Sequence, residues 1–170
     1  MSTATEERTY RGLFGAFPYA FRSSDSLLFK LYVVVGGFLA FAVGSLFGLA
    51  LVVLLGSTAA AGAGSFTFVR PLFIVVGLFA VAPLLAPVLF VARHHRRGTH
   101  DARYDRLFAA TGFLFILSLY LAAVITTPAD QQARSAGAVA VLLYSLPRPV
   151  GLLPPIAVAV GMYLLHRHLR

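Results

Sequence analysis

The chain has 170 residues, a net charge of +8, 59% hydrophobic residues and a mean hydropathy of +0.84. Only 12% of the residues are charged, about half the fraction of a soluble domain, and there is no cysteine. This composition excludes an ordinary soluble domain, disulfides and Cys-ligated metals, and it predicts an all-α integral membrane bundle.

The basic residues alternate with long apolar stretches along the chain. Eleven of the 14 Lys and Arg residues lie in three regions: Arg8, Arg11, Arg22 and Lys30; Arg93, Arg96, Arg97, Arg103 and Arg106; and Arg167 and Arg170. This alternation predicts four transmembrane spans with both termini in the cytoplasm. We expect the basic loops to contact anionic lipid headgroups, and we expect no nucleic acid because no nucleic-acid motif accompanies the charge.

Residues 1–26 are predicted to form a cytoplasmic tail and an amphipathic interfacial segment. Tyr10, Phe14, Phe17 and Phe21 are spaced 4, 3 and 4 residues apart, so that their rings share one helical face. The rings would lie at the headgroup boundary. The alternative is an apolar cap packed under the bundle. Pro18 is expected to bend or split this helix.

The transmembrane domain, over 27–170, is predicted to begin with a span over 27–55, preceded by residues that can cap a helix (Ser23, Ser24, Asp25 and Ser26). Small residues recur at every fourth position in this span, at Gly36, Ala40, Gly44 and Gly48. Such a ridge allows close approach of another helix, and the expected partner is a helix of the same chain.

The second span is predicted over 69–92, after a small and uncharged outer loop, and the third over 107–125. Pro83 and Pro87 lie inside the second span and should kink it. A doubled kink can mark a gate, but more often it only shapes packing.

The last apolar stretch is interrupted by prolines and allows two interpretations. The favoured one is an outer apolar segment at 136–146 followed by a short fourth span at 150–165. The alternative is one long helix over 137–166, kinked at the prolines, which would place Arg148 deeper in the membrane.

The linker over 93–106 contains the densest polar cluster of the chain. His94, His95, His100 and Asp101 are weak candidates for metal ligands, and Asp105 follows them. The spacing matches no known metal motif, and the interspersed arginines oppose a cation. We therefore expect a solvated basic loop with no metal, no cofactor and no catalytic residue.

These patterns favour a non-catalytic membrane component or accessory subunit, acting with a protein partner or as a homo-oligomer, and they predict no enzyme. One alternative is a small transporter or channel subunit, which the two prolines and the glycine ridge would suit. A second is a membrane enzyme, for which His94, His95, Asp101 and Asp105 would have to converge at the cytoplasmic face.

The N-terminal run YRGLFGAFPYAFRSSDSLLFKLYVVVGG leads into a span rich in Ala, Val, Gly and Leu. This run resembles a family of short four-span membrane proteins of unknown function from halophilic archaea. The resemblance implies an archaeal plasma membrane and transfers no catalytic or binding residue to this chain.

Overall fold

The computed structural model describes residues 12–57, 66–98, 101–132 and 137–169. All regular structure in these ranges is helical, which confirms the predicted all-α fold. The elements are α1 (Gly12–Ser23), α2 (Leu27–Ser57), α3 (Phe66–Arg96), α4 (Ala102–Ile125), the 3-10 turn η1 (Ala129–Gln131), α5 (Ala138–Tyr144), the 3-10 turn η2 (Arg148–Leu152) and α6 (Leu153–His168).

Four of these helical segments are long and apolar enough to cross a membrane. They comprise 31, 29, 24 and 21 residues, at Leu27–Ser57, Phe68–Arg96, Ala102–Ile125 and Arg148–His168. A hydrocarbon core of about 30 Å needs about 20 helical residues, so even the shortest suffices. The last segment reaches this length because η2 leads directly into α6, which continues to His168. The helical segment therefore extends beyond both ends of the fourth span predicted at 150–165.

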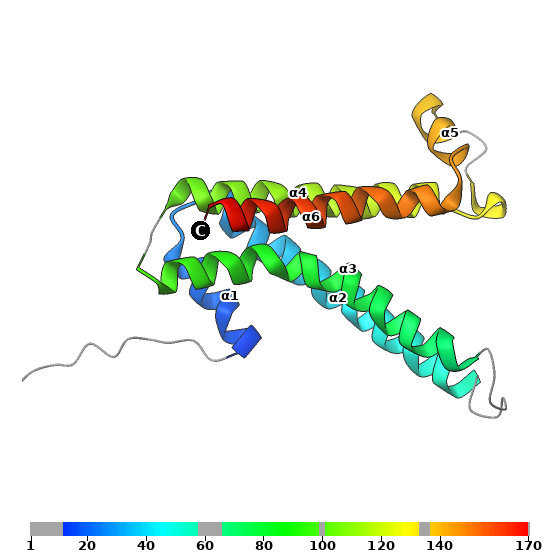
Figure 1. The fold of residues 1–170 in the computed structure, drawn as a ribbon, viewed down its shortest axis with the longest axis horizontal. Coiled ribbons are helices and arrows are strands. Elements are labelled where there is room, and N and C mark those ends of the chain that lie inside the picture. Colours follow the sequence, from blue (N-terminus) through cyan, green and yellow to red (C-terminus); the bar gives the residue numbers. More distant parts are fainter. Residues whose placement is uncertain (1–11, 58–65, 99–100, 133–136, 170) are drawn as a thin grey trace, which may run out of the picture.

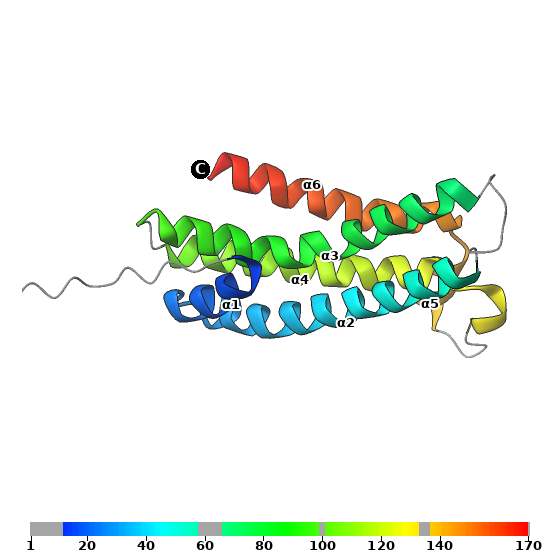
Figure 2. The ribbon, with the colours of Figure 1, turned by 90° about the horizontal axis from the view of Figure 1, so that it is seen from below.

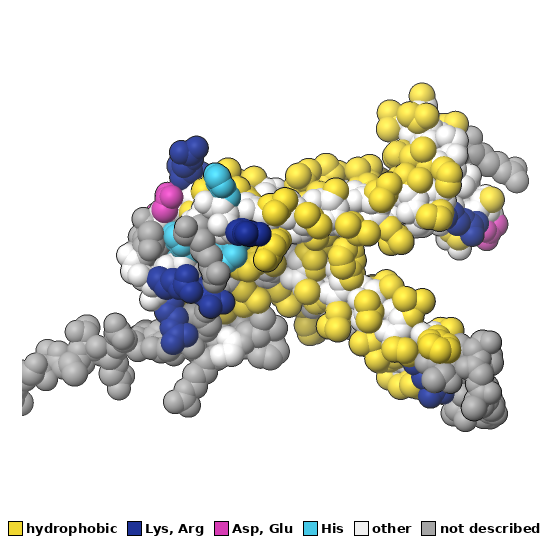
Figure 3. Space-filling view, viewed as in Figure 1, with side chains coloured by type: hydrophobic (Ala, Val, Ile, Leu, Met, Phe, Trp, Pro, Cys, Tyr) yellow, Lys and Arg dark blue, Asp and Glu magenta, His cyan; other side chains and the backbone are white. Residues whose placement is uncertain are grey.

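The long helices form two arms that meet at one end and diverge toward the other (Figure 1). One arm is the antiparallel pair α2 and α3, and the other is the pair α4 and α6. The view from below shows α1 against the end where the arms meet (Figure 2). The space-filling view shows an open cleft between the arms (Figure 3). Most of the described basic side chains lie at the end where the arms meet, which we call the closed end.

Most of the buried residues lie where the arms meet. All buried residues of α2 fall between Phe29 and Ala40, in its first half. Tyr32 is fully buried, its hydroxyl donates a hydrogen bond of 2.7 Å to the carbonyl of Leu84, and its ring lies against Gly112 of α4. A side chain at position 112 would occupy the same space as this ring. The glycine therefore allows α2 and α4 to approach closely at the closed end of the molecule.

Helix α1 is continuous from Gly12 to Ser23, so of the two outcomes expected at Pro18, a bend or a split, the split is excluded. Proline has a helical φ, so Pro18, whose ring is exposed, removes one hydrogen bond to the preceding turn without ending the helix. Helix α1 buries Ala16 and Ala20 completely against the other helices. It therefore packs on the bundle, as the alternative interpretation of this segment expected.

The structure separates the last apolar stretch into two helices. Helix α5 projects from the far end of the α4/α6 arm, and α6 runs back along α4 (Figure 1). The single kinked helix over 137–166 is therefore wrong, because Pro147 and Pro149 stop the chain from continuing helically. Arg148 lies exposed in the connecting turn.

Candidate functional site

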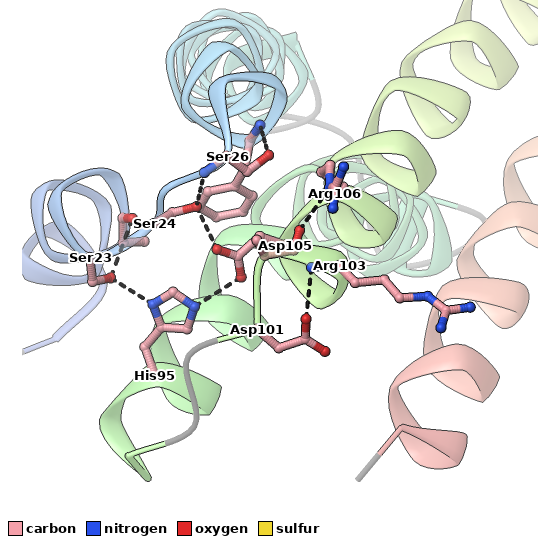
Figure 4. Close-up of polar contacts among 11 residues, drawn as sticks. Ser23, Ser24, Ser26, His95, Asp101, Arg103, Asp105 and Arg106 are labelled. Carbon is pink, nitrogen blue, oxygen red and sulfur yellow. Dashed lines mark hydrogen bonds and ion pairs between the residues drawn. The ribbon is translucent and has the colours of Figure 1, made fainter.

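Four chain segments bring polar side chains together at the closed end of the molecule (Figure 4). Ser23 ends α1, Ser24 lies in the connection to α2, His95 lies in the last turn of α3, and Asp105 lies in the first turns of α4. We call these four residues the junction. Gly98, at φ +81°, follows α3 and lets the chain leave the helix one turn after His95.

The junction is a chain of hydrogen bonds. His95 Nε2 lies 2.9 Å from Asp105 Oδ1, and His95 Nδ1 lies 3.0 Å from Ser23 Oγ. Ser24 Oγ donates to Asp105 Oδ2 at 2.5 Å. His95, Asp105 and Ser24 are all buried. Both carboxylate oxygens and both ring nitrogens therefore have partners within the protein.

The hydroxyl of Ser23 allows the junction to accommodate His95 in either protonation state. With neutral His95 protonated on Nε2, the ring donates to Asp105 and accepts from the serine hydroxyl. With a charged ring, Nδ1 would donate to Ser23, whose hydroxyl can turn to the carbonyl of Ala20 at 3.4 Å. A buried carboxylate is costly unless it is paired and hydrogen-bonded, and here it is both.

Two helix N-termini support this arrangement. Ser26 Oγ accepts from the backbone N–H of Phe29 at 3.3 Å, which confirms the predicted cap of α2. Asp101 caps α4 by accepting from the N–H of Arg103 at 2.8 Å. Asp105 lies in the first turn of α4, where the helix dipole favours a negative charge.

A second layer of rings ties α6 to the same end. The ring of His94 stacks on Tyr104 with centroids 4.0 Å apart, and the Tyr104 hydroxyl lies 2.9 Å from His166 Nδ1. The His166 ring stacks in turn on Phe90, also at 4.0 Å. These contacts join α3, α4 and α6 beside the junction.

The weak metal candidates of the linker occupy different environments. His95 turns inward to Asp105, His94 stacks on Tyr104, and Asp101 is exposed at its helix cap. His100 lies outside the described residues. Within the parts of the chain that the structure describes, no three His, Asp or Glu side chains are grouped so that they could hold a metal ion.

The small residues of α2 lie on more than one surface. Gly36 lies against the ring of Tyr32, and Ala40 is buried at 4% exposure. A Cβ at Gly44 would lie 3.9 Å from Val81 of α3, whereas one at Gly48 would meet nothing within 4 Å. The first part of this ridge thus faces helices of the same chain, and its last residue is open.

Helix α3 changes direction part-way along its length, as a helix containing Pro83 and Pro87 should (Figure 1). The polar groups of the spans are few. Ser118 is buried and donates to the carbonyl of Phe115 in its own helix at 2.7 Å, and Ser45 is exposed.

The aromatic residues of the N-terminal segment divide between two environments. Phe17 is half-buried against α2, and Phe21 is 40% exposed with the Lys30 ammonium 5.8 Å from its ring centroid. Tyr10 and the side chain of Phe14 lie outside the described residues. Of the two rings that the structure describes, Phe21 is the more exposed.

Sequence reasoning missed the roles of Ser23, Ser24, Tyr32 and Gly112. One signal could have found His95, because it continues the buried face of Leu84, Val88 and Val91 at helical spacing. Asp105 likewise precedes Phe108 and Phe115 on the buried face of α4. No local pattern indicates that serines more than 70 residues earlier complete the pair.

In the part of the chain that the structure describes, the fold and the junction define a helical protein with four apolar segments able to cross a membrane, joined by polar contacts at one end. The chain belongs to the family described as "Domain of unknown function (DUF8056)", whose model matches residues 1–170. No curated protein matches the chain, and no solved structure matches it.

Proposed function

We propose that this protein is a non-catalytic integral membrane component that receives a transmembrane helix of a partner protein between its two arms. The observation that carries the proposal is the divergence of the arms (Figure 3). Beyond Ala40, α2 has no buried residue, and only 6% of its most apolar stretch is enclosed by the protein.

A helix pair of this kind has apolar surface that another membrane helix can cover. Lipid tails are as apolar as the side chains, so association depends on close packing between helices. Small residues favour such packing, and Ala50 supplies one on α2. It lies 18 residues, or about five turns, after Tyr32, and so shares the face that meets α4 at the closed end.

The polar junction supports a structural role for the closed end. Among the described residues, no buried side-chain nitrogen or oxygen lacks a hydrogen-bond partner. Since His95 and Asp105 are engaged by each other and by two serines of the same chain, the junction joins the arms and offers no spare group to a substrate.

Site-specific crosslinking tests the proposal. A photoreactive benzoylphenylalanine at Ala50 would face the cleft, and one at Val52 would be rotated by about 200° on the same helix. In native membranes we expect Ala50 to give one stoichiometric protein adduct and Val52 to give none. Lipid adducts alone at both sites, or an adduct with a second copy of this chain, would contradict a role as an accessory subunit.

The orientation in the membrane belongs to the same proposal. The end containing α1, the junction and the end of α6 would lie in the cytoplasm, because the described Lys and Arg residues concentrate there (Figure 3). The surrounding membrane would be the plasma membrane of a halophilic archaeon. Reporter fusions after Gly62, His100 and Gln132 should report outside, inside and outside. The same side for two neighbouring fusions would contradict this orientation.

A further inference from the structure

A groove runs along the seam between α2 and α3, on the side where α1 packs. It consists of two hollows of about 470 and 250 Å³ that share Gly44 and Val81. The larger hollow begins at Phe17 of α1, and the smaller one continues outward between Phe47 and Phe73. Both hollows are lined almost entirely by apolar residues and are open to the side, and their shared residues place them end to end along the seam.

Glycines create this groove by leaving space where side chains would otherwise lie. Gly37, Gly44 and Gly48 of α2 and Gly77 of α3 all line it. Phe47 covers Gly77, with 2.9 Å between its ring and the position of a Cβ there, so that part of the seam is closed. Gly44 and Gly48 meet no such ring, and the groove stays open beside them.

The dimensions of the groove indicate whether its occupant is a protein helix or a single alkyl chain. From Gly37 to Leu51 it extends 14 residues along α2, or about 21 Å. This exceeds the depth of one leaflet, about 15 Å of hydrocarbon. A helix with its side chains is at least about 10 Å wide and would not fit hollows of these volumes. An alkyl chain is narrow enough to lie along the whole groove.

The charge at one end of the groove indicates the headgroup. Lys30 lies seven residues, or about two turns, before Gly37 on the same face of α2. Its ammonium lies 5.8 Å from the ring centroid of Phe21, which follows Phe17 by one turn of α1. A cation about two turns of α2 before the hollows, on the same helical face, suits an amphiphile whose negative headgroup lies beyond the end of the groove.

We infer that the α2/α3 seam binds one alkyl chain of an anionic membrane phospholipid, whose phosphate lies at Lys30. This site is distinct from the cleft between the arms. The lipid would fill the space that the glycines leave and would join α1 to the α2/α3 arm along the seam.

Native mass spectrometry of the full-length protein tests the inference, with palmitoyl-oleoyl phosphatidylglycerol or phosphatidylcholine added to the detergent. We expect the wild type to retain one phosphatidylglycerol and to prefer it to phosphatidylcholine about tenfold. Gly44→Leu should reduce retention of both lipids about tenfold, because the new side chain fills the point that the hollows share. Gly48→Leu should reduce it as well.

Two further variants serve as controls. Gly56→Leu makes the same change on α2 outside the groove, where a Cβ would meet nothing within 4 Å, and it should retain lipid like the wild type. Lys30→Gln should abolish the preference for phosphatidylglycerol and keep binding of phosphatidylcholine. Circular dichroism checks that each variant folds.

Equal retention by Gly44→Leu, Gly48→Leu and Gly56→Leu in folded proteins would overturn the inference. So would an unchanged headgroup preference in Lys30→Gln, or a dimer in the wild type that Gly44→Leu dissociates, since the occupant would then be a second copy. Crosslinking from Ala50 is a separate measurement, so either proposal can fail alone.

Discussion

At the closed end of the molecule, Phe29, Tyr32, Phe108 and Asp105 are all buried among neighbouring helices. The part of α2 beyond Ala40, by contrast, contains no buried residue. The first region combines close packing around Gly112 with the buried hydrogen bond between His95 and Asp105. The second is a helix pair whose side chains mostly face outward. The comparison indicates that the stability of the isolated chain comes from the closed end, and that the arms depend on their surroundings.

The largest expected effect comes from Asp105→Ala. This change leaves His95 and Ser24 buried without their acceptor and should lower the free energy of unfolding by about 3–5 kcal/mol. Asp101→Ala is the matched control, because Asp101 is also an aspartate at the start of α4 but is exposed, and loss of its cap should cost about 1 kcal/mol. Denaturant unfolding in mild detergent, followed by circular dichroism, measures both. Equal losses would show that the junction contributes no more than a surface cap.

A smaller loss is expected from Gly112→Ala, at the contact between α2 and α4. The added methyl group would overlap the ring of Tyr32, and displacing this ring should cost about 1–3 kcal/mol. Gly161→Ala, where a Cβ would meet nothing within 4 Å, should be neutral or slightly stabilising. Adding Tyr32→Leu to Gly112→Ala should recover part of the loss, because leucine is smaller than tyrosine and leaves room for the new methyl group. Purely additive losses would contradict a direct contact between positions 32 and 112.

The smallest effect is expected in the α2/α3 arm. Leu49 is 65% exposed, so Leu49→Ala should change the free energy of unfolding by no more than about 0.5 kcal/mol. Phe115→Ala on α4 removes a fully buried ring and should cost about 3–5 kcal/mol under the same conditions. If Leu49→Ala destabilises the purified protein as much as Phe115→Ala, Leu49 must be buried in the purified protein. The contrast between a packed closed end and an exposed α2/α3 arm would then be wrong.

The long helices were predictable because a membrane span needs only length and uninterrupted apolar composition. The sequence placed the start of α2 at Leu27 and the end of α4 at Ile125, as the structure has them. The prolines around Arg148 also indicated a break that the structure contains. Helix ends that are set by polar residues were harder to predict. Helix α3 extends four residues beyond the predicted end of its span, to Arg96, because His95 continues its buried face.

The junction could not be predicted from local patterns. The linker histidines and aspartates were recognisable as a polar cluster, but the phase of α3 decides that His95 turns inward and His94 does not. The serines were interpreted as helix caps, and Ser26 is one. That Ser23 and Ser24 also bind His95 and Asp105 depends on how α1 packs on α3, which the sequence of neither helix specifies alone.

The junction also has a consequence for the order of assembly during synthesis. Ser24 precedes Asp105 by 81 residues and Ser23 precedes His95 by 72, so the hydroxyls are made long before their partners. The α2/α3 hairpin can be inserted and paired while the rest of the chain is still on the ribosome. Only when the beginning of α4 emerges can the carboxylate reach the histidine, and that event joins an already inserted hairpin to the helices that follow.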